Sequence, residues 1–407
     1  MTMKDKINQM VRNFHPAWYA TVMGTGGLAN AVYLFLGKIP FFEKVAQALV
    51  LFNIALFVIL IFPWVARWIW HRDILVEDMK NPLLGNFFVT MPVGMVVLGS
   101  NLYLIGPKMF TQAFIHLAGL VLFICGAPLI FFFTIAILYY AYTREALSPD
   151  HINFSWFITP VADIVVPILG TPIAAHYLSS AYATAKIITI VDIIFYGIGF
   201  MLFLFVGSVV FHRFINHKLP HPQVSPTFWI ILGPIGIGVV GLFNIADALQ
   251  SLGMLTETGT LKVFGAILWG FGFWAFLQTV VLTIRYWKEG VPFSMSWWAY
   301  IFPFAVYTIS TFVISTFFQS DAVYWYGVGL LVMLAVMWFI VLIRSLLSLK
   351  VLLFPPAPKP TATKSMFQKW LMELHAGTEH EKPREHMSVS NEIPSKSQEN
   401  TRTAEQK

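Results

Sequence analysis

The sequence predicts an all-α polytopic membrane protein with ten transmembrane helices, arranged as five helical hairpins around a central pore. Hydrophobic residues make up 57% of the 407 residues, charged residues only 11%, and the mean hydropathy is +0.70. A water-soluble domain carries roughly a quarter charged residues, so most of this chain is expected to lie in lipid. The apolar runs are long and uninterrupted, which excludes a membrane β-barrel, whose strands alternate in polarity over about ten residues.

Ten windows of the sequence are long and apolar enough to cross a bilayer. A transmembrane helix needs about 20 apolar residues to cross a hydrocarbon core of about 30 Å. The segments between the windows are short, so neighbouring helices are expected to pair as antiparallel hairpins. The windows are Phe14–Phe35, Val45–Trp68, Leu84–Ile105, Phe114–Tyr140, Phe154–Tyr177, Ile187–Phe211, Phe228–Leu249, Val263–Ile284, Trp297–Phe317 and Val323–Ile343.

Lysine and arginine residues are distributed unevenly between the connecting segments. With the N-terminus in the cytoplasm, the cytoplasmic segments hold 13 of the 26 lysines and arginines, the external segments hold 5, and the tail after Lys350 holds the remaining 8. Because cytoplasmic loops carry the basic excess, both termini are predicted to lie on the inner, cytoplasmic side of the cell membrane. The net charge of +6 is then a topology signal, and no nucleic-acid partner is expected.

Four odd-numbered windows carry a proline at a similar depth: Pro92, Pro160, Pro234 and Pro303. The first window has the sequence MGTGG there instead. Proline removes a backbone N–H, and a membrane helix tolerates it where the freed groups meet protein or water. The regular depth favours five repeated hairpins with kinked odd helices inside and even helices outside, although prolines are common in membrane helices. The four prolines are therefore candidate pore-lining residues.

Three regions are expected along the chain: a cytoplasmic N-terminal segment (1–13), the ten-helix transmembrane domain (14–350) and a cytoplasmic tail (351–407). The tail begins with the proline-rich stretch FPPAPKPTATK. The stretch SMFQKWLMELH then has apolar residues at helical spacing, which predicts a short amphipathic helix near 365–375 on the membrane surface. A regulatory plug is the alternative. The rest of the tail is polar and is predicted to be disordered.

Four sequence motifs carry a family resemblance. HPAWYATVMGTGGLA, NPLLGNFFVTMP, WIILGPIGIGVVG and SWWAYIFPFA stand in this order at the first, third, seventh and ninth windows. Together they resemble the tellurite-resistance/dicarboxylate transporter family, which includes the plant slow anion channels and the yeast malic acid permease. The resemblance implies ten helices in five hairpins, a pore lined by the odd helices and a homotrimer with one pore per subunit. It also implies anionic substrates such as malate, other C4-dicarboxylates, sulfite or inorganic anions.

The first window contains a cluster of small and polar residues that keeps bulky side chains off one face. Its members are Thr21, Gly24 and Thr25, with Gly26 and Gly27 beside them. Small residues allow helices to pack closely, and the same absence of bulk could line a narrow passage. Both interpretations stay open at this point, and Thr21, Gly24 and Thr25 are candidate pore-lining residues.

Fixed positive charge is almost absent from the windows: lysine does not occur there, and arginine occurs only at Arg67 near a cytoplasmic end. Anions would then be held weakly, by hydroxyl groups and by the N-terminal ends of half-helices that begin at the prolines. Such weak binding suits rapid passage. Asp163 lies three residues after Pro160, and an ionisable group at this depth is a functional hypothesis, here proton coupling. Asp192 and Asp247 are interpreted as structural.

Phe302 precedes the proline of the ninth window. The corresponding residues of the other windows are Met91, Thr159 and Gly233, so only the ninth window places a large rigid ring there. The resemblance implies the same residue, because the phenylalanine of the family's ninth-helix motif is its pore gate and Phe302 holds that place in WWAYIFPFA. An ordinary core aromatic is the alternative, with Phe304 two residues away. Phe302 is the predicted pore gate.

The leading functional hypothesis is a cell-membrane transporter or channel for C4-dicarboxylates such as malate, and the alternative is an exporter of sulfite or another small anion. An enzyme is not expected, because no paired catalytic residues, nucleophile elbow, phosphate loop or zinc-protease motif is found. A sensor or scaffold that acts through the tail is a third class. His116 and His176 form no ligand pair at helical spacing, and Cys125 is the single cysteine. No metal and no cofactor is therefore predicted.

Overall fold

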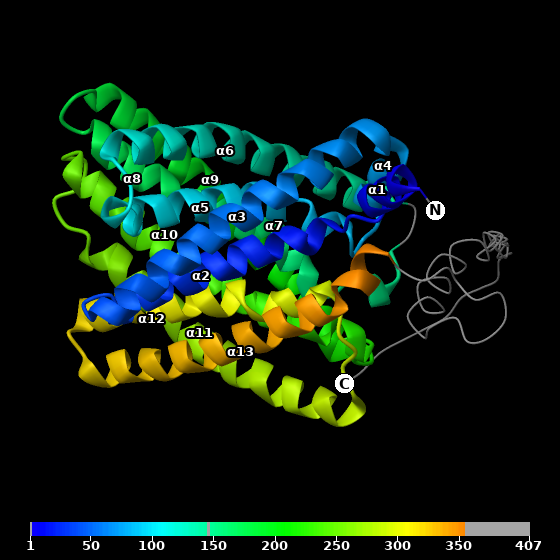
Figure 1. The fold of residues 1–407 in the computed structure, drawn as a ribbon. Helices are drawn as coiled ribbons and strands as arrows, with labels where there is room; N and C mark the ends of the chain where they lie inside the picture. Colours follow the sequence, from blue (N-terminus) through cyan, green and yellow to red (C-terminus); the bar gives the residue numbers. More distant parts are fainter. Residues whose placement is uncertain (1, 145–146, 355–407) are drawn as a thin grey trace, which may run out of the picture. The chain divides into compact units, whose positions relative to one another are not determined.

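A computed structural model describes residues 2–144 and 147–354, and within these residues every regular element is a helix. Figure 1 shows long helices that run side by side in one bundle, with the short helices α1 and α4 at one end. This end is called the α1 end below. The amphipathic helix predicted near 365–375 and the proline-rich stretch before it lie outside the described residues. The all-helical class predicted from the sequence is confirmed for the described part of the chain.

The long helices are joined by short turns, so consecutive helices lie antiparallel (Figure 1). The last described helix ends at the α1 end, where the chain also begins. The helices are α1 (Met3–Arg12), α2 (Tyr19–Leu36), α3 (Pro40–Trp70), α4 (Arg72–Lys80), α5 (Thr90–Leu104), α6 (Gln112–Tyr142), α7 (Ile158–Ile164), α8 (Pro167–Tyr177), α9 (Tyr182–Asn216), α10 (Leu232–Ser251), α11 (Gly259–Glu289), α12 (Phe302–Phe318) and α13 (Asp321–Leu353).

Nine helical segments of the described chain are long and apolar enough to cross a membrane. They correspond to the second to the tenth windows of the sequence. The first window forms the 18-residue helix α2, which does not belong to these nine. Its three glycines, two threonines and Asn30 lower its hydropathy, and almost all of its residues are buried against protein. A helix that contacts protein on every side does not need large apolar side chains that face lipid, which the neighbouring helices have.

The helices fall into two layers that differ in burial. In the segments that contain α5, α7 with α8, α10 and α12, between 72% and 83% of the most apolar stretch is buried. In α3, α6, α9, α11 and α13 this share is between 22% and 39%. The first group, together with α2, is called the buried layer, and the second group the exposed layer. Exposed-layer helices are single elements of 31 to 35 residues, each with one side turned away from the protein.

A 3-10 helix near the α1 end precedes α2, α5, α7, α10 and α12 of the buried layer, whereas α8 follows α7. The 3-10 helices are η1 (Pro16–Trp18), η2 (Gly85–Phe87), η5 (Phe154–Phe157), η6 (Pro222–Ile231) and η7 (Met295–Tyr300). They contact one another in the order η2, η5, η6, η7 and η1, and η1 in turn contacts α5, which follows η2. The 3-10 helices therefore form a ring at the α1 end of the buried layer, which is closed through the start of α5.

The four prolines lie where these 3-10 helices give way to α-helix. Pro92, Pro160 and Pro234 are the third residues of α5, α7 and α10, and Pro303 is the second residue of α12. We expected kinks within longer helices, and the structure instead places the prolines in first turns. A first-turn residue has no intrahelical partner for its N–H, so proline loses nothing there.

The fifth window is broken once more, because α7 ends at Ile164 and α8 begins at Pro167. Proline is favoured as the first residue of a helix, since its fixed φ suits the helix and its missing N–H is not needed. This second break was not predicted from the sequence, although Pro167 and Pro172 are visible in it. It makes α7 the shortest helix of the buried layer, with seven residues.

Candidate functional site

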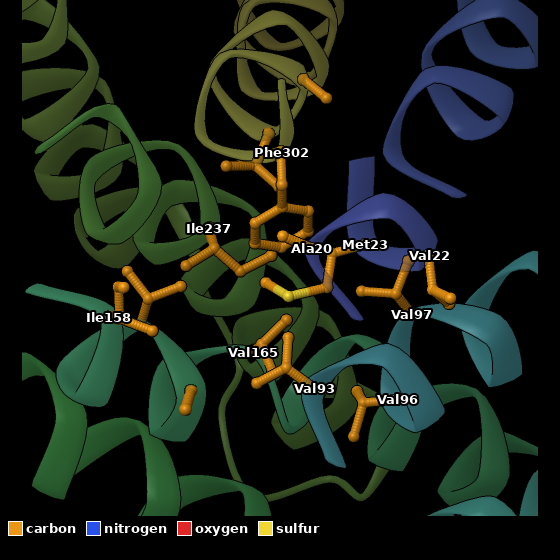
Figure 2. Packing of buried hydrophobic residues seen from close by; sticks show 14 of the residues in the cluster. Ala20, Val22, Met23, Val93, Val96, Val97, Ile158, Val165, Ile237 and Phe302 are labelled. Atoms are coloured by element: carbon orange, nitrogen blue, oxygen red, sulfur yellow. The ribbon is translucent and has the colours of Figure 1, made fainter. Parts of the chain in front are cut away.

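Apolar side chains from α2, α5, α10, α12 and the junction of α7 and α8 meet at one level of the bundle and form one apolar layer. Figure 2 shows Phe302 at the start of α12, with Met23 of α2, Ile237 of α10, Val93 of α5 and Val165 from the junction of α7 and α8 gathered beside it. All five side chains are buried, with Phe302 only 3% exposed. The middle of the buried layer is therefore closed at this level by one aromatic ring and aliphatic side chains.

Phe302 and Phe304 have different surroundings although two residues separate them. The Phe304 ring stacks on Phe276 of α11 at 5.6 Å between ring centroids and meets Trp229 edge-on at 5.1 Å. It is thus fixed between α12 and the exposed layer. The Phe302 ring lies among aliphatic neighbours instead, over Gly27 of α2, where an added Cβ would come within 3.6 Å of it. Phe302 therefore has the neighbours of a movable ring, and its role as the gate stays a prediction.

The glycines of α2 allow other helices to approach closely. A Cβ on Gly24 would lie 2.9 Å from the Ile301 side chain, and one on Gly27 would lie 2.8 Å from Ala305. A Cβ on Gly26 would lie 2.6 Å from Asn101 of α5. Gly24 and Gly27 thus face α12 while Gly26 faces α5, which supports the packing interpretation of these residues. A place for Gly24 along a passage stays a prediction.

The hydroxyl groups predicted to line a pore make hydrogen bonds within the protein. Thr21 donates to the Trp18 carbonyl at 2.7 Å, and the Thr25 hydroxyl accepts from the indole N–H of Trp338 at 3.1 Å. Trp338 belongs to α13, so the Thr25 hydroxyl is directed toward the exposed layer. A hydroxyl that already donates to a backbone carbonyl has its only proton in use. Thr21 would have to exchange this bond before it could donate to an anion.

The four prolines are buried, and two of their carbonyl groups face helices of the exposed layer. A Cβ on Gly199 of α9 would lie 2.6 Å from the Pro160 carbonyl oxygen, and one on Gly126 of α6 would lie 3.4 Å from that of Pro92. Pro303 approaches α10 at Gly233. Close packing thus surrounds the first turns of these helices, and their place along a pore is a prediction.

Asp163 is fully buried between α7 and α6. Its Oδ2 accepts a hydrogen bond of 2.8 Å from the Thr134 hydroxyl of α6, whereas its Oδ1 has no hydrogen-bond partner in the described chain. An ionised carboxylate with one hydrogen bond is costly at such a site. The partner on α6 shows that this carboxyl points toward the exposed layer.

The other two acidic residues of the windows differ from Asp163. Asp192 of α9 is buried against α8, where a Cβ on Gly170 would overlap its carboxylate, and it accepts from Thr171 at 3.4 Å. Asp247 pairs with Lys262 at 2.6 Å and is largely exposed. These contacts agree with the structural roles expected for both residues. The helices of the buried layer contain no lysine or arginine, so no fixed cation lies on them.

A buried network of asparagines was missed by the sequence analysis. Asn101 of α5 donates to the Gly26 carbonyl at 2.9 Å and to Asn30 of α2 at 2.7 Å, and its side-chain oxygen accepts from Asn53 of α3 at 3.0 Å. The network thus ties α2, α3 and α5 together. Three asparagines in three different windows were the available signal, since amides are costly in lipid unless they find partners.

Two histidines from separate helices lie together at the other end of the bundle. His116 of α6 and His176 of α8 stack with 3.8 Å between ring centroids. His116 also makes hydrogen bonds with Tyr103 at 2.9 Å and with Tyr177 at 3.0 Å. No group of three or more potential metal ligands is found among the described residues. The pair was not foreseen, because helical spacing within one helix does not report contacts between helices.

The amino-acid sequence of this chain is similar to those of known membrane transport proteins. The family model described as voltage-dependent anion channel matches residues 13–346. An uncharacterized transporter of Methanocaldococcus jannaschii is 36% identical over 337 residues, which cover 83% of this chain and 93% of that protein. A sulfite efflux pump of Arthroderma benhamiae is 23% identical over 81% of this chain and 89% of its own length. A malic acid transport protein of Schizosaccharomyces pombe is 23% identical over 83% of this chain and 78% of its own length.

Proposed function

This chain belongs to the voltage-dependent anion channel family of membrane transporters, also called the tellurite-resistance/dicarboxylate transporter family, and we propose that it moves C4-dicarboxylates such as malate across the cytoplasmic membrane. The proposed pathway runs along the middle of the buried layer. Phe302 is its gate, and the first turns at Pro92, Pro160, Pro234 and Pro303 belong to its lining.

The apolar layer around Phe302 is the observation that carries this proposal. It lies where α2, α5, α10, α12 and the junction of α7 and α8 meet, so a change there acts on the middle of the bundle (Figure 2). An apolar constriction blocks ions because it has no polar groups that could replace the hydration shell of the ion. A ring that turns away removes this obstruction without any change in the helices. The aliphatic neighbours of Phe302 allow such a movement, whereas Phe304 is held between two aromatic rings.

The electrostatics of the buried layer support a transporter that binds its anion weakly. No lysine or arginine lies on these helices. Their N-terminal ends, which carry partial positive charge, begin near the ring of 3-10 helices. Partial charges attract an anion without holding it in a tight ion pair, which allows it to leave. Asp163 is proposed to bind a proton during transport, as a group beside the pathway and not as an anion ligand.

The finer architecture is part of the proposal. Ten transmembrane helices, with α2 as the first, form five hairpins whose buried members surround the pore and whose exposed members face lipid. The alternation of high and low burial along the chain supports this arrangement. Both termini are proposed to be cytoplasmic, in agreement with the basic excess of the segments on that side. A homotrimer with one pore per subunit rests on the family resemblance.

Export of sulfite is the second candidate function. It is favoured by the similarity to the sulfite efflux pump of Arthroderma benhamiae, which is as close in identity as the malic acid transport protein. Malate and sulfite are both small anions, and the described residues of the apolar layer around Phe302 include no charged group that would favour one of them over the other.

Flux measurements in reconstituted vesicles test the proposal. Vesicles that contain the purified protein are loaded with radiolabelled malate or with sulfite, and efflux is followed with and without a pH gradient. Malate flux well above that of protein-free vesicles supports the proposed function, whereas sulfite flux without malate flux supports the second candidate. Absence of flux for both anions from folded protein would contradict the proposed function.

A further inference from the structure

A hollow at the α1 end of the bundle lies outside the apolar layer of Phe302. It is partly open to the surroundings and shallow, with room inside for little more than one water molecule. Its floor includes Thr159 and Pro160 at the start of α7, and its walls include Ile137 and Ala141 of α6 and Leu202 of α9. The hollow thus lies between two helices of the exposed layer, whose outer sides carry large exposed apolar residues such as Phe131 and Phe205.

The rim of this hollow is basic and polar. Arg144 and Asn81 line it, and Lys80 precedes Asn81 in the chain. The Arg144 Nε donates to the Tyr140 carbonyl at 3.1 Å, and its guanidinium makes no ion pair with the described residues. Burial lowers the pKa of Arg144. None of the described residues that line the hollow is acidic.

The rim lies at the depth expected of the bilayer interface. The exposed rings of Tyr139 and Tyr142 stand on the last turns of α6, and Trp156 lines the hollow from η5. Tyrosine and tryptophan gather where hydrocarbon gives way to lipid headgroups. Lys80 lies 6.0 Å from the centre of the Tyr140 ring. Arg144 and Lys80 are therefore expected at the level of the lipid headgroups, beside the apolar side of α6.

We propose that an anionic phospholipid binds at the mouth of this hollow, with its phosphate in contact with Arg144 and Lys80 and its acyl chain against the exposed apolar sides of α6 and α9. The argument rests on the combination of a basic rim with apolar walls, because a soluble anion would use only the rim. The floor at Thr159 and Pro160 connects this lipid to the first turn of α7, a helix of the buried layer. This inference does not depend on which anion the protein transports.

The test measures lipid binding to the full-length protein in detergent by native mass spectrometry. Phosphatidylglycerol and phosphatidylcholine with the same acyl chains are titrated separately, and inorganic phosphate is added as a competitor. The variants are Arg144→Gln, which removes the charge, and Ala141→Trp, which fills the hollow. Arg344→Gln is the matched control, since Arg344 is an exposed basic residue of α13 that does not line the hollow.

Wild-type protein is expected to bind phosphatidylglycerol more tightly than phosphatidylcholine. A basic residue near an anionic headgroup contributes enough for Arg144→Gln to weaken phosphatidylglycerol binding about fivefold. Phosphatidylcholine binding should hardly change in this variant, and Ala141→Trp should weaken both lipids. Arg344→Gln should behave as the wild type.

Two results would overturn the inference. The first is equal phosphatidylglycerol binding by Arg144→Gln and Arg344→Gln, together with unchanged binding by Ala141→Trp. The second is displacement of the lipid by millimolar inorganic phosphate, on the order of intracellular anion levels. Free phosphate lacks the acyl chain, so it should compete poorly if apolar contacts contribute to binding. Displacement would therefore make the hollow a site for soluble anions. Gel filtration and thermal unfolding of each variant confirm that folded protein is compared, and Ala141→Trp decides the question if Arg144→Gln does not fold.

Discussion

The two layers of this protein use glycine differently. In the buried layer, a Cβ on Gly236 of α10 would lie 2.4 Å from the backbone nitrogen of Tyr307 in α12. In the exposed layer, Gly197, Gly270 and Gly329 have nothing within 4 Å of such a Cβ. The exposed helices also hold glycines that face inward, such as Gly199. The comparison teaches that glycine content alone does not identify the buried layer, whereas the approach of a neighbouring backbone does.

The layers also differ in how their helices begin. Apart from α8, which follows α7, the buried-layer helices follow 3-10 segments with proline in or near the first turn, and they contain 7 to 20 residues. Exposed-layer helices continue for 31 residues or more, even through Pro63 of α3 and Pro128 of α6. Proline inside a membrane helix is tolerated when neighbouring groups satisfy the freed carbonyl. The short helices therefore result from the ring of 3-10 segments and not from proline alone.

The largest expected effect concerns the contact between α10 and α12. Gly236→Ala should destabilise the protein by about 3 kcal/mol, because the new methyl group meets backbone atoms that cannot move without separating two helices. Gly270→Ala of α11 is the control and should be neutral or slightly stabilising, since the methyl group meets open space. Unfolding of both variants in detergent, followed by circular dichroism, measures the difference. Equal stability of the two variants would remove the distinction between the layers.

The second prediction compares the two phenylalanines of α12. Phe302→Ala should raise anion flux about tenfold, which corresponds to a barrier lowered by about 1.4 kcal/mol. Phe304→Ala should not raise flux, and it should lower stability by roughly 3 kcal/mol, because a ring packed between Trp229 and Phe276 is lost. Vesicle flux per folded protein is the measurement. Unchanged or lower flux from folded Phe302→Ala protein would assign this ring to ordinary packing.

A smaller effect is expected from the asparagine network that joins the layers. Asn101→Leu removes three hydrogen bonds, to Gly26, Asn30 and Asn53. Side-chain hydrogen bonds between membrane helices contribute about 0.6 kcal/mol on average, so we expect a loss of about 1 to 2 kcal/mol. Asn216→Leu at the exposed end of α9 serves as the control. If both variants unfold at the same denaturant concentration, the network does not stabilise the contact of α2 with α5.

The smallest expected effect is on the pH dependence of flux. Asp163→Asn keeps a hydrogen-bonding side chain beside Thr134 but cannot bind a proton. If Asp163 must be protonated during transport, wild-type flux rises as the pH falls, and the variant lacks this rise. Asp247→Asn, at the exposed ion pair with Lys262, should keep the wild-type profile. Identical profiles for all three proteins would reassign Asp163 to a structural hydrogen bond with α6.

The helical class, nine long apolar helices and the positions of their turns could be predicted from the amino-acid sequence. The length and hydropathy of a segment are local properties, and a long apolar segment is stable as a helix in lipid wherever it lies in the bundle. The sequence also pointed to Pro92, Pro160, Pro234 and Pro303, because proline restricts the backbone in any context. The sequence predicts ten spans, and α2, which is covered by protein and has a lower hydropathy, is not among the nine helices of the described chain that are long and apolar enough to cross a membrane.

Which side of each helix faces which neighbour could not be predicted from the sequence and is seen in the packed bundle. A soluble helix reveals its buried side by its polar residues, but a helix in lipid is apolar on all sides, so this pattern is absent. The direction of Asp163 toward Thr134, the separate faces of Gly24 and Gly26, and the stacking of His116 on His176 therefore depended on packing between helices. The neighbours of Phe302 were likewise decided by the assembly of the buried layer, because each of them comes from a different part of the chain.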